Sequence, residues 1–390
     1  MTWSPFRPDI IKDPANGHQS LLGECPVHRC EEFDPAFYTL SRYEDVADAL
    51  KNHTTFSSHF GQGPRFSEPQ GMLCDPPVHT HLRRIVQKAF SPRAMAQLRP
   101  QVEHLSQQLI REIKERPEQE FDLHDDFAFP LPVIIIAGML GVPEQDLNQF
   151  KVWSDIQVAA MGAEDPTIYA KDQAAFLSYL QQQFLARREA LNIQQEVPDD
   201  LLTLIAGARD LQDEPLSQAD ALSMLSQLLV GGNETTTSLI TNVVWRLLQQ
   251  PELWERLVDN PDLIEVAIEE SLRFDPPVLG LYRNTTHSVT LHGETIPEKC
   301  KVYLYYAAAN RDASVFETPD EFNLDRPKKR HLSFGSGLHF CLGAPMARME
   351  AEIALRHLLE ALPGLTLQSD GDRIPPFFLW GRKTLPVAWS

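Results

Sequence analysis

The sequence is poor in positive charge and lacks a long apolar run. Lys and Arg number 35 against 54 Asp and Glu, so the formal net charge is -19, which argues against nucleic acid or an anionic membrane as a partner. The longest apolar stretch, residues 127–142, contains Pro130 and Pro132 and is too short to span a bilayer, so we expect a buried core helix there. The first 16 residues contain no apolar run either, so we expect no signal peptide, no membrane anchor and a cytoplasmic location.

Cysteine is also scarce, with five residues in a chain of 390. That number excludes the disulfide framework of a small secreted domain. Cys25, His28 and Cys30 lie close together, but two sulfurs and one imidazole without a clear fourth ligand make a poor zinc site. We therefore expect ordinary packing at that position.

Hydrophobic content of 43% and charged content of 23% are typical of a globular protein. Residues 1–35 look irregular, and residues 54–77 are rich in Ser, Gly and Pro and predict a long loop. From His79 to about Gln250 the pattern is helical, with breaks near prolines. We expect one mainly α domain over 1–390 with small β-sheets.

Shorter elements surround that helical region. A strand is predicted at 36–40, followed by a helix over Tyr43–Lys51. A helix of roughly 34 residues is predicted over 217–250, with Ser217 as its N-cap and Asp220 completing a variant capping box. Strands are predicted at 288–291 and 301–306.

Residues 334–343 read Phe-Gly-Ser-Gly-Leu-His-Phe-Cys-Leu-Gly and precede a helical stretch. Cys341 is thereby placed at a helix N-terminus, where backbone N–H groups favour a thiolate, a good soft ligand for iron. The string resembles the haem-binding loop of the cytochrome P-450 superfamily at every fixed position. The resemblance implies haem b, with iron bound by Cys341 and the ring packed against Phe334, Gly335 and Gly343.

The predicted long helix contains Gly231, Gly232, Glu234 and Thr235 in a run ending with three threonines. Glycine and threonine are poor helix formers, and Thr235 can bond back to the Gly231 carbonyl. Taken alone, this pattern also fits a bent core helix. It resembles the family's oxygen-activating motif, which implies that Thr235 and Glu234 manage protons and that the glycines let dioxygen and haem approach.

Two further motifs match the family. Glu270 and Arg273 lie at i,i+3 on one helix face and resemble its structural Glu-x-x-Arg element, completed by Arg326. The haem propionates need cations or hydrogen-bond donors. The resemblance assigns these contacts to His79, Arg83, Arg283 and His339.

The implied fold places the haem between the long central helix and the cysteine loop with its following helix. We expect an apolar substrate pocket above it. Its predicted wall residues are Met72, Leu73, Gln227, Val230, Val278, Leu279, Phe377 and Phe378.

The resemblance implies a soluble monooxygenase: R–H + O2 + 2 e⁻ + 2 H⁺ → R–OH + H2O. The expected substrate is a small or medium-sized hydrophobe, such as a terpenoid, norisoprenoid, aromatic, fatty-acid or steroid skeleton. Electrons would come from a separate ferredoxin with its NAD(P)H-dependent reductase, docking on a basic cluster. The core of this basic cluster is Arg326, Lys328, Lys329 and Arg330. Candidate additions to the cluster are Arg84, Lys88 and Arg348.

Three alternatives remain open. A peroxygenase would have no need of the Glu234–Thr235 pair, and a haem sensor would usually need an output domain for which no residues are left. A biosynthetic haem-thiolate enzyme that performs dehydration, ring coupling or C–C cleavage is equally compatible with these motifs.

Overall fold

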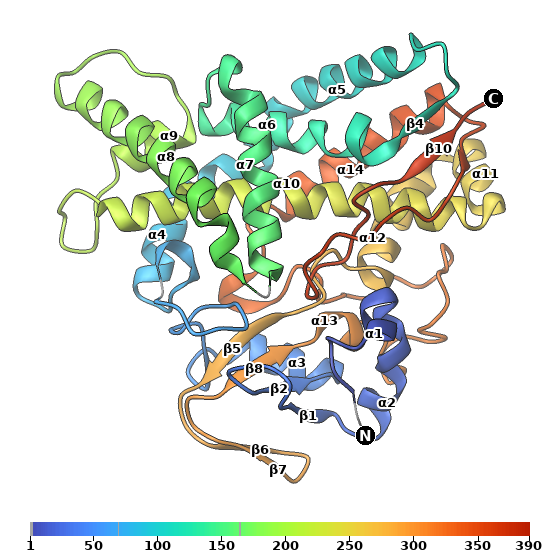
Figure 1. Ribbon diagram of the computed structural model, residues 1–390, viewed down its shortest axis with the longest axis horizontal. Helices are drawn as coiled ribbons and strands as arrows, with labels where there is room; N and C mark the ends of the chain where they lie inside the picture. Colours follow the sequence, from blue (N-terminus) through green and yellow to red (C-terminus); the bar gives the residue numbers. More distant parts are fainter. Residues whose placement is uncertain (1–2, 69, 164) are drawn as a thin grey trace.

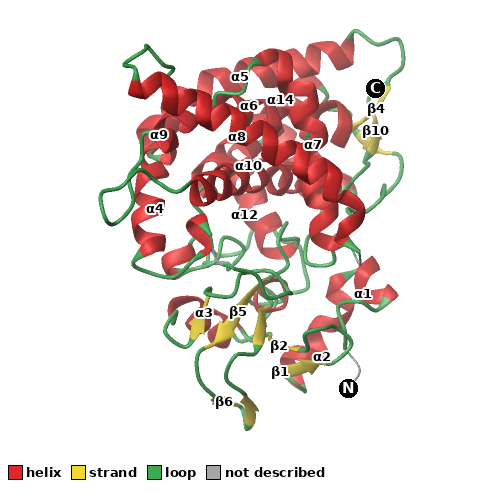
Figure 2. Ribbon diagram, turned by 60° about the vertical axis from the view of Figure 1, so that its left-hand side comes forward, coloured by secondary structure: helices red, strands yellow, loops and turns green. Residues whose placement is uncertain are grey.

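The computed structural model describes residues 3–68, 70–163 and 165–390. Figures 1 and 2 show a large helical part stacked on a smaller part that holds most of the strands. The helices are α1 Pro8–Lys12, α2 His18–Gly23, α3 Tyr43–Lys51, α4 Val78–Gln87, α5 Pro92–Lys114, α6 Pro130–Leu140, α7 Leu147–Gly162, α8 Ala170–Asn192, α9 Leu201–Ala206, α10 Gln218–Leu248, α11 Pro251–Asp259, α12 Ile264–Phe274, α13 Tyr306–Ala309 and α14 Ala344–Ala361.

The helix α10 crosses the middle of the helical part (Figure 1) and contacts α6, α7, α12 and α14. It has 31 residues, and the Ser217 hydroxyl accepts a hydrogen bond from the Asp220 backbone N–H at 3.0 Å, so the predicted N-cap is confirmed. Against it packs α6, which is apolar on nearly every side and mostly buried. A helix of that composition belongs in a core, as the sequence predicted.

The strands form three small sheets. They are β1 Val27–Cys30, β2 Phe37–Leu40, β3 Phe56–Ser57, β4 Glu120–Asp122, β5 Leu281–Thr285, β6 Val289–Leu291, β7 Glu294–Ile296, β8 Lys301–Leu304, β9 Thr366–Leu367 and β10 Pro386–Ala388. The largest sheet has the order β1-β2-β8-β5-β3, in which β2 and β8 run parallel and the other pairs antiparallel. This sheet forms part of the wall of an internal cavity, because Leu281 and Arg283 on β5 line that cavity.

The prediction that residues 1–35 are irregular is wrong in part. This segment forms α1, α2 and β1, and β1 is a strand because it pairs antiparallel with β2, the next strand along the chain. His28 on β1 also bonds the Trp3 carbonyl oxygen through Nε2 at 2.8 Å, which ties the segment down. The predicted strand 301–306 is shorter than expected, since Tyr306 already begins α13.

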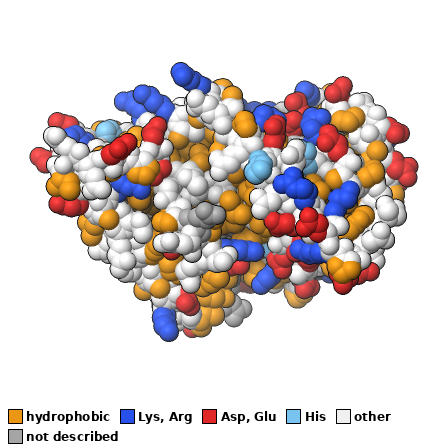
Figure 3. Space-filling model, turned by 90° about the horizontal axis from the view of Figure 1, so that it is seen from above, with side chains coloured by type: hydrophobic (Ala, Val, Ile, Leu, Met, Phe, Trp, Pro, Cys, Tyr) orange, Lys and Arg blue, Asp and Glu red, His pale blue; other side chains and the backbone are white. Residues whose placement is uncertain are grey.

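The molecular surface carries charges of both signs. Figure 3 shows Lys and Arg side chains interspersed with Asp and Glu over the face seen from above. None of the helices in the described ranges combines the length and apolar character that a membrane span requires.

Candidate active site

A cavity of about 300 Å³ lies between α10, the loop before α14 and the edge of the largest sheet. Its wall gathers segments that are far apart in the sequence, from the loop before α4 to the start of α14. The predicted site residues that line it are Met72, Leu73, Arg83, Gln227, Gly231, Gly232, Thr235, Val278, Arg283, Phe334, Gly335, His339, Cys341 and Gly343. The fold therefore brings most of the predicted site into one space.

The cysteine loop is a tight backbone structure. The Cys341 N–H donates to the Phe334 carbonyl oxygen at 2.9 Å, and α14 begins three residues after the cysteine. Gly337 has a φ of +69°, and a Cβ there would lie 2.8 Å from the Leu50 carbonyl oxygen. Only glycine meets both conditions, so this position fixes how closely the loop approaches α3.

The environment of Cys341 favours the protonated thiol in the absence of a metal, whereas the sequence predicted a thiolate. Burial raises the pKa of the Cys341 thiol. Hydrogen bonds from the Gly343 and Ala344 backbone N–H groups and the charges of Arg83 and Arg348 act against that rise without cancelling it. Binding to a metal ion deprotonates a thiol outright, so the same N–H groups would then stabilise the bound sulfur.

On the opposite wall, Thr235 faces the cavity and donates a hydrogen bond to the Gly231 carbonyl oxygen at 2.9 Å, as predicted. A Cβ on Gly231 would meet nothing within 4 Å, so this glycine leaves open space beside the cavity. A Cβ on Gly232 would lie 2.8 Å from Ile136 Cγ1. Gly232 thus also permits close packing of α6, a role that the sequence did not suggest.

Glu234 is buried at 4% exposure, although the described cavity wall does not include it. Burial, with a contribution from the charge of Asp155, raises the pKa of Glu234 to about 8. The Ser238 hydroxyl donates to Glu234 Oε1 at 3.4 Å and weakly opposes the shift. The carboxyl therefore holds a proton at neutral pH, next in sequence to the hydroxyl of Thr235.

Cationic and imidazole side chains gather at the sheet side of the cavity. Arg283 is 2% exposed, and neither it nor Arg83 pairs with a carboxylate in the part of the chain that the structure describes. His79 is equally buried, and neither of its ring nitrogens finds a hydrogen-bond partner among the described residues. Buried cations and donors without partners fit a bound anionic group.

His339 packs against His79 with the ring centroids 4.3 Å apart and the ring planes tilted by 52°, and both of its ring nitrogens have polar partners. Nδ1 lies 3.3 Å from Gln62 Nε2, and Nε2 lies 3.2 Å from Ser58 Oγ. Burial and the charge of Arg283 lower the pKa of His339 to about 2, so the ring is neutral. It lines the cavity beside Arg283, and its contact with a propionate stays a prediction.

The Glu270 network lies behind the cysteine loop and agrees with its prediction. Arg273 donates to both Glu270 oxygens at 2.8 and 2.7 Å, and Arg326 Nε donates to Glu270 Oε1 at 3.0 Å. The Asn323 backbone N–H adds a bond to the same carboxylate at 2.9 Å. Glu270 and Arg273 are 5% and 3% exposed, so these are buried charges with full sets of partners.

Four predicted pocket residues lie off the cavity wall that the structure describes: Val230, Leu279, Phe377 and Phe378. Phe377 instead packs on Phe6, with ring centroids 4.7 Å apart, which uses the N-terminal segment that was expected to be irregular. The Leu279 backbone N–H donates to the Phe378 carbonyl oxygen at 2.9 Å, and both side chains are buried in the core. Their place in a substrate pocket stays a prediction.

Other wall residues were missed. Leu228 and Leu239 lie on the same face of α10 as Thr235, so helical periodicity could have identified them. Gln62 comes from the long loop, where no periodicity applies, and nothing in the sequence signals it.

The donor set fits haem. The cavity offers one thiol for iron, and two guanidinium groups without carboxylate partners stand where carboxylates of a flat ring could reach. Apolar side chains such as Phe334, Leu342 and Met346 complete the wall.

Comparison with known proteins agrees with this geometry. The model of the cytochrome P-450 family matches residues 158–383. Cytochrome P-450 109 of Bacillus spizizenii is 38% identical over 95% of this chain and 90% of its own length. The crystal structure of the cytochrome P-450 enzyme CYP109B1 from Bacillus subtilis is similar with a TM-score of 0.84 and 33% identity, over 96% of this chain and 99% of that one. CYP109E1 from Bacillus megaterium, in complex with testosterone, has a TM-score of 0.85 and 30% identity over 97% and 99% of the two chains.

Proposed function

This chain belongs to the cytochrome P-450 family of haem-thiolate monooxygenases, and on that premise we propose that it inserts one oxygen atom of O2 into a small or medium-sized hydrophobic substrate. One observation carries the proposal: the Cys341 thiol and the Thr235 hydroxyl line a single, mostly apolar cavity. A bound haem supplies the activation of dioxygen, and the protein supplies orientation, protons and a water-poor site.

In this proposal the Cys341 thiolate would bind the haem iron, and the cysteine loop sets the position of that sulfur. Arg83 Nη2 donates to the Phe340 carbonyl oxygen at 2.5 Å, so a cavity-lining cation also braces the residue before the ligand. Arg83, Arg283 and His79 would hold the propionates, because neither guanidinium pairs with a carboxylate among the described residues and the buried His79 ring has no hydrogen-bond partner there. His339 supports them indirectly through its contacts with His79 and Gln62.

Thr235 and Glu234 divide the handling of protons. Thr235 presents its hydroxyl to the cavity, where it can stabilise a protonated oxygen species by hydrogen bonding. Glu234 is protonated at neutral pH because burial raises its pKa to about 8, so it can give a proton and regain it. Asp155 on α7 lies near enough to Glu234 for its charge to raise that pKa, which supports a proton path that involves α7.

The substrate should be hydrophobic, because the wall above the cysteine loop is formed by groups such as Met72, Leu73, Leu228, Leu239 and Val278. The related CYP109E1 was solved with testosterone, which supports a compact apolar skeleton. A screen by the low-spin to high-spin shift of the haem, followed by product analysis with a ferredoxin system, tests this. Spin-shift binding of sugar phosphates with no response to any hydrophobe would contradict it.

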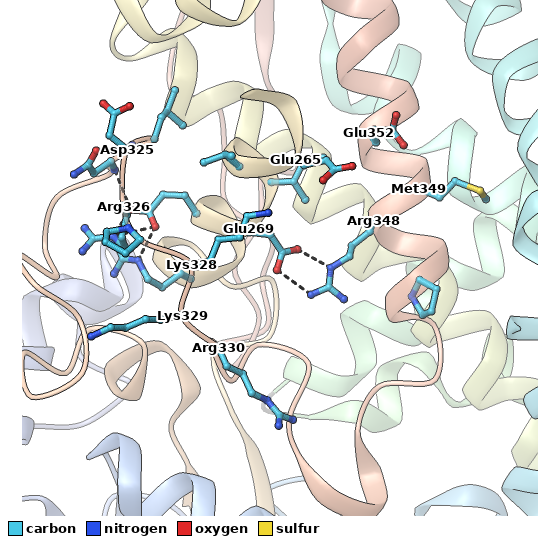
Figure 4. Close-up of a pocket in the computed structure, with 18 of the residues that line it drawn as sticks. Glu265, Glu269, Asp325, Arg326, Lys328, Lys329, Arg330, Arg348, Met349 and Glu352 are labelled. Atoms are coloured by element: carbon cyan, nitrogen blue, oxygen red, sulfur yellow. Dashed lines mark hydrogen bonds and ion pairs between the residues drawn. The ribbon is translucent and has the colours of Figure 1, made fainter. Parts of the chain in front are cut away.

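An acidic ferredoxin is the proposed electron donor, and a groove of about 940 Å³ behind the cysteine loop is its proposed docking site. Two residues of the predicted basic cluster are already neutralised there. Arg348 donates to both oxygens of Glu269 at 2.6 and 3.0 Å (Figure 4), and Arg326 belongs to the Glu270 network.

The exposed cations of the groove are Lys328, Lys329 and Arg330, which lie together on one loop (Figure 4). Arg84 and Lys88 are exposed at the end of α4, and the neighbouring Arg83 contacts the cysteine loop. These five charges stand out in a chain of net charge -19, and they can steer an acidic partner by electrostatic attraction.

A further inference from the structure

The roof of the cavity, residues 70–73, is attached to α10 by the side chain of Gln227. Gln227 Oε1 accepts a hydrogen bond from the Met72 backbone N–H at 3.0 Å. Gln227 Nε2 donates to the Gln70 carbonyl oxygen at 3.0 Å and to the Ser223 hydroxyl at 2.7 Å. Both ends of the amide are thus used on protein groups, and two of the three bonds go to the backbone of this roof segment.

A second contact joins the roof segment to the start of α10. Asp220 Oδ1 accepts from the Gly71 backbone N–H at 3.1 Å, while Asp220 Oδ2 accepts from the Ser217 hydroxyl at 2.7 Å. Asp220, Ser223 and Gln227 follow one another at helical spacings of three and four, so they occupy one face of α10. The next turn of that face carries Gly231, which lines the cavity.

Gly71 is the point of closest approach. Its φ is +61°, and a Cβ at this position would lie 2.9 Å from Gln227 Nε2 and 3.0 Å from Ser223 Oγ. The backbone conformation and the space therefore both require glycine. On the other side, the Cys74 thiol contacts the Gly71 carbonyl oxygen at 2.9 Å.

These contacts change the interpretation of Gln227. Its type and position suggest a group that orients one polar atom of the substrate, but both N–H donors and one of the two oxygen lone pairs of its amide already bond the roof segment and Ser223. We infer that Gln227 is a specificity-determining positioning residue, which sets the size limit of the substrate by holding Met72 and Leu73 against the cavity. The inference rests on the proposed function in one respect, namely that this cavity holds the substrate above the haem.

The size limit follows from what the roof segment carries. Met72 and Leu73 both line the cavity, and Leu73 is 39% exposed. With the Gln227 bonds removed, the roof segment keeps the Asp220 and Cys74 contacts but loses the two bonds nearest to the cavity. It can then move outward, which admits larger ligands and leaves the cysteine loop unchanged.

Hydrogen exchange tests the attachment without requiring any activity. In Gln227→Leu, protection of the Met72 amide should fall roughly tenfold, because its hydrogen-bond acceptor is gone. Gln227→Glu should keep that protection, since a carboxylate still accepts the N–H. Gln218→Leu, an exposed glutamine on the first turn of α10, is the matched control and should leave the exchange unchanged.

Azole binding to the ferric haem tests the size limit, using imidazole as a small probe and clotrimazole as a bulky one. In Gln227→Leu we expect clotrimazole to bind about tenfold faster than in the wild type, while imidazole binding changes less than twofold. Gln218→Leu should resemble the wild type for both probes.

The outcomes separate the inference from the proposed function. Unchanged Met72 exchange in Gln227→Leu overturns the attachment, whether or not the protein binds haem. Faster exchange with both azoles affected equally overturns the size limit and leaves the attachment standing as purely structural. A protein that binds no haem contradicts the proposed function, and with it the size limit, while the exchange result still decides the attachment.

Discussion

On the cysteine side of the cavity the chain is held by buried charges, whereas on the roof side it is held by a few neutral or half-exposed hydrogen bonds. On the cysteine side, the Glu270 carboxylate accepts hydrogen bonds from two guanidinium groups and one backbone N–H, all within 3.2 Å. The roof segment depends on Gln227 and Asp220, which are not fully buried. Removing one partner of a buried ion pair leaves an uncompensated charge, so single substitutions should disturb the cysteine side more than the roof segment.

The largest effect should come from Glu270→Gln, which leaves Arg273 and Arg326 without their buried counter-charge. Breaking one partner of a buried ion pair costs about 3–5 kcal/mol, a large part of the stability of an ordinary domain. Glu265→Gln, an exposed glutamate on the same helix, should change the free energy of unfolding by less than about 0.5 kcal/mol. Urea unfolding and haem content should be measured for both variants. Equal losses of stability in Glu270→Gln and Glu265→Gln would contradict the view that buried charges hold the cysteine side.

Glu234 should give the next largest effect, as a dependence of stability on pH. Its folded-state pKa of about 8 lies above the ordinary 4.5, so between these values the folded state binds more protons than the unfolded state. The free energy of unfolding therefore falls as pH rises through this window. At roughly 1.4 kcal/mol per pKa unit the total is a few kcal/mol.

Glu234→Gln should abolish this loss, so it should be more stable than the wild type at pH 8.5 but not at pH 4. Thermal melts at both pH values test the expectation, with the exposed Glu252→Gln as control. If wild type and Glu234→Gln melt with the same pH dependence, the carboxyl is not held protonated by burial.

Thr235→Ala should separate the roles of the two cavity walls. Because Thr235 does not touch the cysteine loop, we expect haem binding and the substrate-induced spin shift to persist. Product per NADH should fall severalfold, with hydrogen peroxide released instead, since the hydroxyl no longer stabilises the protonated oxygen. Thr241→Ala, which also loses a bond from Oγ1 to the α10 backbone, is the control. Full coupling in a haem-loaded Thr235→Ala protein would remove Thr235 from proton handling.

The smallest effect should be on electron delivery to the cysteine side. Lys328→Glu combined with Arg330→Glu should slow reduction by an acidic ferredoxin, and added salt should slow the wild type in the same direction. Lys171→Glu on α8, an exposed charge of the same kind, should have little influence. A reduction rate that ignores both the double substitution and the salt would place the docking site elsewhere.

The same contrast explains how far the sequence could be interpreted. Cys341, Glu270 and Thr235 belong to short motifs, and in the structure Cys341 and Thr235 line the cavity while Glu270 pairs with Arg273. Val230, Leu279, Phe377 and Phe378 were assigned to the pocket by their place in the chain and lie off its described wall. For Phe377 the reason is a long-range contact: the N-terminal segment folds back and packs Phe6 on this ring, which no local sequence pattern encodes.

Gln227 shows the same limit at a single position. The sequence placed it correctly beside the cavity, but its hydrogen bonds go to backbone atoms of residues 70 and 72, more than 150 positions away. Such bonds do not depend on the side chains of the loop, so the loop sequence carries little trace of them. β1 was missed for a similar reason, since its pairing with β2 and not its composition makes it a strand.

The most direct test of the account is the absorption spectrum of the ferrous–CO complex, in the wild type and in Cys341→His. Cys341 is the described cysteine that lines the cavity, while the half-buried Cys25 and Cys300 lie off its described wall, so their substitution to alanine should leave the Soret band unchanged. We expect the red-shifted Soret band of thiolate ligation in the wild type and its loss in Cys341→His. Absence of the band from the haem-loaded wild type, or its survival in Cys341→His, would contradict the account.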